Sequence, residues 1–100
     1  KQEVWNKSFE TAGVLNRAGV KVCITADHDV TPLYYLPIYA AMAVRFGMDD
    51  AEALRAVTSY PAEILGIDDR KDADLVIWSH HPFDIHAKAE HVFIEGKQEC

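Results

Sequence analysis

One run of β-branched and apolar residues constrains this chain more than any other feature. Residues 20–25 read Val-Lys-Val-Cys-Ile-Thr, and helical patterns precede and follow them. Such a run is typical of a strand in a parallel sheet, where helices cover both faces. A single helix–strand–helix unit cannot bury both faces of its own strand. We therefore expect an α/β fold, either a barrel or an open sheet, of which this chain is a fragment.

Helical periodicity accounts for most of the first two thirds of the chain. It predicts four helices, at residues 8–19, 36–46, 50–58 and 61–65. The second should begin near Tyr34 or Tyr35, because Pro37 is tolerated only in a first turn. Asp49, with Glu52 three residues later, has the pattern of a capping box and should open the third helix. Gly19 should end the first helix in a left-handed conformation.

The pattern changes after residues 68–72. Short strands are predicted at 75–78, 90–94 and 97–99, with Glu95-Gly96 as a two-residue turn. We expect a boundary here between two units, residues 1–67 and residues 68–100.

Charge and composition exclude several classes of partner. The formal charge is −6 with no basic run, so nucleic acid is excluded as a partner. No apolar stretch approaches the roughly 18 residues of a membrane span, and the first residues lack the apolar segment of a signal peptide. Two cysteines are too few for a disulfide framework, which favours a cytoplasmic location. Cys23 is expected in the core and Cys100 at the surface.

Asp27 is the strongest candidate for chemistry. It follows the predicted buried strand directly, and catalytic groups of α/β barrels lie at the carboxyl ends of strands. A carboxylate there can bind a metal and take a proton from a metal-bound water. Alternatively, the side chain folds back onto the following amides and forms a turn. Position alone leaves both interpretations open.

Two further residues near Asp27 are candidates for substrate binding. His28 can contact substrate or metal, although a polar loop role is favoured because a lone histidine is weakly diagnostic. Tyr34 lies at the loop-to-helix junction, where a pocket wall and simple packing are both open. The remaining histidines lack the spacing of a zinc site and are expected in loops or at the surface: His80, His81, His86 and His91.

Three blocks of sequence, in this order, resemble the C-terminal end of the metal-dependent amidohydrolase superfamily. The blocks are residues 18–28, residues 51–58 with 61–67, and residues 71–78 with 92–97. The imidazolonepropionase-like and cyclic-amide hydrolase branch is the most similar. The resemblance implies a (β/α)8 TIM barrel with a small composite β-sandwich. Residues 1–67 would then be the last helix–strand–helix portion of the barrel, and residues 68–100 would be strands of the sandwich.

The resemblance also implies an activity. Asp27 matches the aspartate after barrel strand eight, which binds the metal, usually zinc, and carries a proton from water to the leaving amine. The reaction would hydrolyse a non-peptide carbon–nitrogen bond in a small-molecule substrate, often a cyclic amide. The family's other ligands, histidines and a carboxylate or modified lysine, have no match in this chain. We therefore expect the 100 residues alone to bind no metal tightly and to be inactive.

Two departures from the family pattern stand out. The Gly-Ser-Ile/Leu-x-x-Gly stretch that normally precedes Lys71 is missing, and Tyr60 replaces the usual asparagine before Pro61. The cap of the following helix should then come from Ser59 or be weaker. The rest of the barrel is an expected partner, as is a second copy in a homo-oligomer. The alternative is a non-catalytic fragment or a binding and assembly module without activity of its own.

Overall fold

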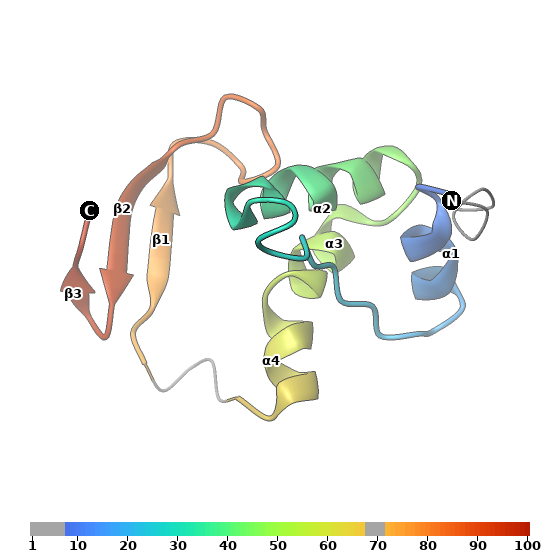
Figure 1. Ribbon diagram of the computed structural model, residues 1–100, viewed down its shortest axis with the longest axis horizontal. Helices are drawn as coiled ribbons and strands as arrows, with labels where there is room; N and C mark the ends of the chain where they lie inside the picture. The colour runs from blue at the N-terminus through green and yellow to red at the C-terminus, as the bar shows by residue number, and fades with distance from the viewer. Residues whose placement is uncertain (1–7, 68–71) are drawn as a thin grey trace.

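The computed structural model describes residues 8–67 and 72–100, with helices first and strands second (Figure 1). The boundary predicted at 68–72 falls almost wholly outside the described residues. The elements in chain order are α1 (Thr11–Arg17), the 3₁₀ helix η2 (Leu33–Tyr35), α2 (Leu36–Arg45), α3 (Asp50–Ala56), α4 (Ser59–Leu65), β1 (Leu75–Trp78), β2 (Ala89–Ile94) and β3 (Lys97–Gln98).

The helix boundaries largely confirm the predictions. Pro37 lies in the first turn of α2, and the Asp49 carboxylate accepts a hydrogen bond from the Glu52 N–H at 3.2 Å, which caps α3. Gly19 has a φ of 88° and directs the chain out of α1, as expected of a residue without a Cβ. None of the helices in the described part of the chain is long and apolar enough to cross a membrane.

The prediction of a buried strand at residues 20–25 is wrong for this chain. The segment is extended but belongs to no sheet among the described residues, and Val20 and Cys23 are exposed. The expected core position of Cys23 is therefore also wrong. The physical reason is that a strand is buried by its neighbours, and the three described strands pair with one another instead.

One hydrogen bond and a set of alanines hold the extended segment against the helices. The Ile24 N–H donates to the Ala56 carbonyl at 3.0 Å. That carbonyl lies in the last turn of α3, where it has no acceptor role within the helix. Ala53 and Ala56 are fully buried and pack with Ala43 and Met48, while Ile24 packs against this cluster from outside. The small side chains let α2, α3 and the extended segment approach closely.

The strands form an antiparallel sheet in the order β1-β2-β3. Leu75 pairs with Phe93, and the register shifts by a bulge between Ile77 and Trp78. Glu95 and Gly96 join β2 to β3 with φ values of 51° and 79°, the positive pair that a tight hairpin turn requires. The Asp74 carboxylate accepts the Glu95 N–H at 2.8 Å and so ties this turn to the start of β1.

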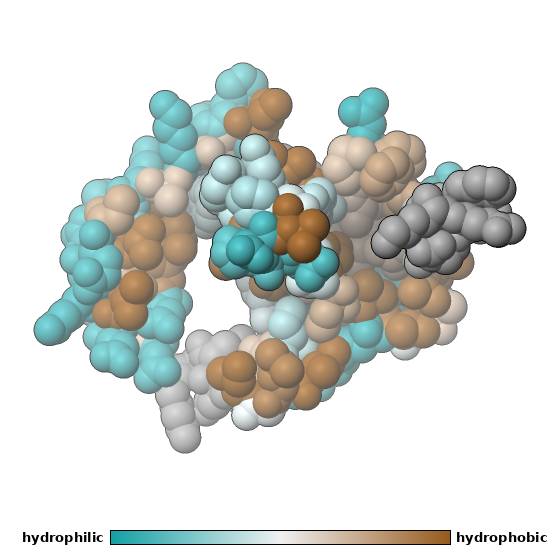
Figure 2. Space-filling model, viewed as in Figure 1, coloured by the Kyte–Doolittle hydropathy of each residue, from teal (hydrophilic) through white to brown (hydrophobic). Residues whose placement is uncertain are grey.

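The chain exposes more surface than a complete domain of its size. Its accessible surface is 7694 Å², against about 5,700 Å² for a compact protein of this mass. Its radius of gyration is 14.7 Å, against about 13 Å for a compact domain of 100 residues. Figure 2 shows apolar surface over α4, where Ile64, Leu65 and Ile67 are all more than half exposed. Apolar surface of this extent is typical of a part that packs against further structure.

Glu52 joins three helices through its carboxylate. Oε2 accepts hydrogen bonds from the Tyr60 hydroxyl at 2.6 Å and from Asn16 Nδ2 at 3.2 Å, and Oε1 accepts from Arg55 at 3.0 Å. The bond from Tyr60 is the main reason that the pKa of Glu52 lies below its ordinary value. Tyr60 therefore links α4 to α3. Of the two expectations for the start of α4, the cap from Ser59 is wrong, since α4 begins at Ser59, and the weaker cap is confirmed, since no side chain caps this helix.

Replacing Gly13 by alanine should destabilise the fold. A Cβ at residue 13 would lie 3.0 Å from Met48 N and 3.1 Å from the Gly47 carbonyl carbon, both main-chain atoms. Alanine normally favours a helix interior by about 1 kcal/mol, but the steric conflict should reverse the sign and cost about 1–3 kcal/mol. Chemical denaturation of the protein that carries these residues measures the change. Val14→Ala, on the exposed side of the same helix, is the control, and a more stable Gly13→Ala variant would contradict the close approach.

Glu52→Gln should lower thermal stability in a pH-dependent way. Hydrogen bonds lower the pKa of Glu52 in the folded state. The contribution of the ionised carboxylate to the free energy of unfolding is therefore complete above the ordinary pKa of 4.5, and it is lost as the pH falls through the lower pKa of the folded state. The difference in Tm between the variant and the parent should therefore be largest near neutral pH and shrink below about pH 4.5. Glu10→Gln is the control, and a pH-independent difference would show that ionisation of Glu52 contributes nothing.

Candidate functional site

Asp27 lies where the extended segment turns away from the helices, and its main chain is held on both sides. Its N–H donates to Thr25 Oγ1 at 3.3 Å, and its carbonyl accepts from the N–H groups of Val30 and Thr31 at 2.9 and 3.3 Å. Its φ is 55°, in the left-handed region that aspartate tolerates better than most residues. The backbone of Asp27 therefore has a defined orientation although the residue is exposed.

The carboxylate of Asp27 takes no part in this turn. Among the described residues, none donates a hydrogen bond to it, and the carbonyl oxygen makes the contacts that close the loop. The turn-forming alternative is thus half right: Asp27 does lie in a turn, but the following amides bind its main chain instead of its side chain. The side-chain oxygens remain available to a substrate, a proton or a metal.

His28 follows Asp27 and closes the other end of the same loop. Its Nδ1 accepts a hydrogen bond from the Leu33 N–H at 3.2 Å, and Leu33 is the first residue of η2. We call residues 27–33 the Asp27 loop. His28 therefore has the loop role that was favoured from the sequence, and its exposed ring leaves the second nitrogen open.

Tyr34 lies on a different cavity. Its ring centroid is 4.6 Å from that of Tyr35, and a hydrogen bond with Tyr35 raises the pKa of Tyr34. Tyr34 lines a cavity of about 370 Å³ between α2 and the loop after β1, with Trp78 and Phe83 in the same wall. Neither Asp27 nor His28 lines this cavity. Asp27 and His28 thus lie together in the Asp27 loop, whereas Tyr34 lines a cavity that contains neither of them.

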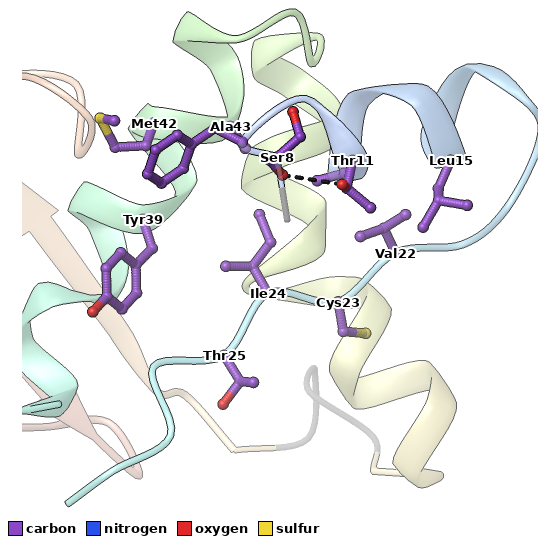
Figure 3. A pocket seen from close by; sticks show the side chains of 12 residues that line it. Ser8, Thr11, Leu15, Val22, Cys23, Ile24, Thr25, Tyr39, Met42 and Ala43 are labelled. Atoms are coloured by element: carbon purple, nitrogen blue, oxygen red, sulfur yellow. Dashed lines mark hydrogen bonds between the residues drawn. The ribbon is translucent and has the colours of Figure 1, made fainter. Parts of the chain in front are cut away.

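A second cavity, of about 360 Å³, separates the extended segment from α1 and α2 (Figure 3). Figure 3 shows Val22 and Ile24 pointing to one side of the segment and Cys23 and Thr25 to the other. This alternation is that of a β-strand, even without a pairing neighbour. The wall of this cavity is mostly apolar and contains no acidic or basic side chain, so the cavity suits packing better than catalysis.

The other histidines lie outside the Asp27 loop, in the loop and surface positions expected from their spacing. His80, His81 and His86 lie in the loop after β1, and His91 lies on β2. The Asp84 carboxylate accepts the His86 N–H at 2.8 Å, the main reason that the pKa of Asp84 is lowered.

The donors in this chain fit only part of a metal site. Within residues 8–67 and 72–100, no three histidine, cysteine, aspartate or glutamate side chains gather closely enough to hold a metal. Zinc usually takes three or four protein ligands. Asp27 can supply one carboxylate, and the remaining ligands would have to come from outside these residues.

Two contributors to the Asp27 loop were missed from the sequence. Thr25 binds the Asp27 N–H through its hydroxyl, and the Leu33 N–H binds His28. A threonine two residues before an aspartate is a known local motif and could have been found. The bond between His28 and Leu33 depends on the path of the loop, which the residue pattern does not specify.

Comparison with known proteins gives a family match over most of the chain. Residues 4–98 match the family model described as "Amidohydrolase family". The chain is 27% identical over 103 residues to the amidohydrolase tasK of Hapsidospora irregularis, covering 96% of this chain and 10% of that protein.

A solved amidohydrolase structure contains a segment with the same backbone path as this chain. The chain superposes on an amidohydrolase from Thermotoga maritima MSB8 with a TM-score of 0.91 and 38% identity, covering 100% of this chain and 28% of that one. It therefore spans about a quarter of that structure and a tenth of the curated relative. A family match over nearly every residue leads to one conclusion: the chain belongs to the amidohydrolase family.

Proposed function

We propose that the intact protein is a metal-dependent hydrolase of carbon–nitrogen bonds other than peptide bonds, and that it acts on a small cyclic amide. Asp27 is its catalytic carboxylate and one of its ligands for zinc or another divalent metal. His28 contributes to substrate binding next to Asp27, and Tyr34 contributes from the separate cavity that it lines. The family match supports hydrolysis by the intact protein, and the substrate class and the metal are our extension of it.

The observation that carries the proposal is the state of Asp27. Its main chain is fixed by three hydrogen bonds while its carboxylate accepts none from the described residues. A structural aspartate normally uses its side chain to satisfy nearby amides. A carboxylate left exposed on a fixed backbone is instead suited to accept a proton or to bind a cation in a defined direction.

The proposed step is a proton transfer by Asp27. The carboxylate takes a proton from the attacking water as the carbon–oxygen bond forms, and delivers it to the nitrogen as the carbon–nitrogen bond breaks. One ring-opened product results, with a carboxylic acid at the former carbonyl and an N–H at the former ring nitrogen, which balances the addition of one water. When bound, the metal would polarise the carbonyl and lower the pKa of the water to about 7. The loop bonds of Asp27 hold its main chain in a defined orientation.

The rest of the chain has a supporting role in this proposal. Residues 1–67 supply the last part of a barrel, with residues 20–25 as its final strand, and residues 68–100 supply strands of a small sandwich. The exposed apolar residues of α4 then pack against other parts of the intact protein, which we place in a homo-oligomer in the cytoplasm. The free thiols of Cys23 and Cys100 suit that compartment.

Asp27→Asn in the intact protein should reduce hydrolysis by about 10²- to 10⁴-fold, the usual range for a lost acid–base group. Asparagine tolerates the left-handed backbone, so the loop should keep its shape. The assay follows the gain of one water by mass spectrometry on glutarimide, hydantoin and dihydrouracil. Asp29→Asn, two residues along the same loop, is the matched control. Equal hydrolysis by Asp27→Asn and the parent would contradict the catalytic role of Asp27, whereas no hydrolysis by the parent would favour the alternative of a non-catalytic module.

Removal of metal should abolish hydrolysis in the intact protein. Dialysis against a chelator should stop turnover, and stoichiometric zinc should restore it in the parent. Asp27→Asn should recover less metal, measured by elemental analysis of the dialysed and reloaded proteins. Full activity after complete loss of divalent metals would contradict the metal-dependent part of the proposal.

A further inference from the structure

The Asp27 loop ends at a helix start that lacks its own cap. Leu33 is the first residue of η2, and the residue before it, Pro32, makes no side-chain hydrogen bond there. The first N–H groups of a helix have no partner within it. The imidazole of His28 supplies this partner from five residues upstream, since its Nδ1 accepts the Leu33 N–H at 3.2 Å.

This bond also determines which nitrogen of the ring can donate. A neutral imidazole has one donor and one acceptor nitrogen. Because Nδ1 accepts from a main-chain N–H, the proton of the neutral ring is on Nε2. His28 is exposed and adjoins Asp27. The His28 ring therefore offers an N–H donor in the residue next to Asp27, whose ionised carboxylate can only accept hydrogen bonds.

We infer that His28 has two separate functions in this site. Its Nδ1 positions the Asp27 loop by binding the Leu33 N–H, and its Nε2–H donates a hydrogen bond to a carbonyl oxygen of the substrate. The first function is independent of the enzyme activity, whereas the second rests on the proposed function. His28 is a positioning residue through Nδ1 and a substrate-binding residue through Nε2.

Two sets of hydrogen bonds close the Asp27 loop, and only the set that includes His28 joins the loop to η2. The inner closure joins the Asp27 carbonyl to the N–H groups of Val30 and Thr31, and the outer closure joins His28 to Leu33. The outer closure connects the loop to η2 and, through it, to α2. Without it, we expect the inner turn to persist, tied to α3 through Ile24 but no longer hydrogen-bonded to the start of η2.

Three substitutions separate the two functions. His28→Asn keeps an acceptor oxygen at the position of Nδ1 but has no atom at Nε2. His28→Gln places an amide donor near the position of Nε2 but loses the acceptor at Nδ1. His28→Ala loses both. His81 provides a matched control, because its Nδ1 accepts the Phe83 N–H at 3.1 Å in the loop after β1 and makes no hydrogen bond to the Asp27 loop among those of the described residues.

Hydrogen exchange of the Leu33 amide in the full-length protein tests the positioning function. His28→Ala should exchange roughly fivefold faster than the parent, the factor expected for the loss of one intramolecular hydrogen bond. His28→Asn should restore protection, and His81→Ala should leave the Leu33 amide unchanged. Equal exchange rates in His28→Ala and the parent would overturn the inference, whether or not the protein is a hydrolase.

Steady-state kinetics on whichever of glutarimide, hydantoin and dihydrouracil the parent hydrolyses test the donor. His28→Asn should raise KM about tenfold with little change in kcat, and His28→Gln should lower kcat with a smaller change in KM. A KM unchanged by His28→Asn would overturn the donor function. If the parent hydrolyses none of the three, the donor function fails together with the proposed function, while the exchange experiment still decides the positioning function.

Discussion

The hydrogen bond from the Ile24 N–H to the Ala56 carbonyl is the contact on which the placement of the site depends. It joins the extended segment to the last turn of α3, and Asp27 follows three residues later along the same segment. The bond can form only because Ala53 and Ala56 are small and fully buried, so that the segment lies close to the helix. A larger side chain at either position would push the two elements apart and move Asp27 with them.

The same close packing explains why this core is so small. Five of the six buried apolar residues are alanines, the sixth is Met48, and no large side chain is fully buried among the described residues. Alanine allows near approach but buries little apolar surface, and burial is what stabilises a fold. The large apolar residues lie instead on outer faces, such as Ile64 and Leu65 on α4. The chain thus has tightly packed helices around small buried residues, while its large apolar side chains lie on exposed faces.

Local features were predictable from the sequence, and features that need distant partners were not. The proline in the first turn of α2, the cap at Asp49 and the turn at Glu95-Gly96 each depend on a few neighbouring residues, and each was found. The burial of residues 20–25 depends on neighbouring strands that the described residues do not supply, so the prediction of burial was wrong. Asp27 was selected from its place after an apolar run. The bond from Thr25 follows a local motif that could have been found, whereas the bond between His28 and Leu33 depends on the path of the loop, which has no simple residue pattern.

The hairpin of β2 and β3 has a consequence for the order in which the chain folds. Its contacts are almost all between near neighbours, and the carboxylate of Asp74 fastens its turn to the strand beside it. Low contact order of this kind allows rapid formation, since little chain entropy is lost before contacts are gained. The extended segment has the opposite character, because the Ala56 carbonyl is in place only once α3 is helical. The hairpin of β2 and β3 is therefore expected to form before the Asp27 loop, which acquires its shape only after the helices behind it.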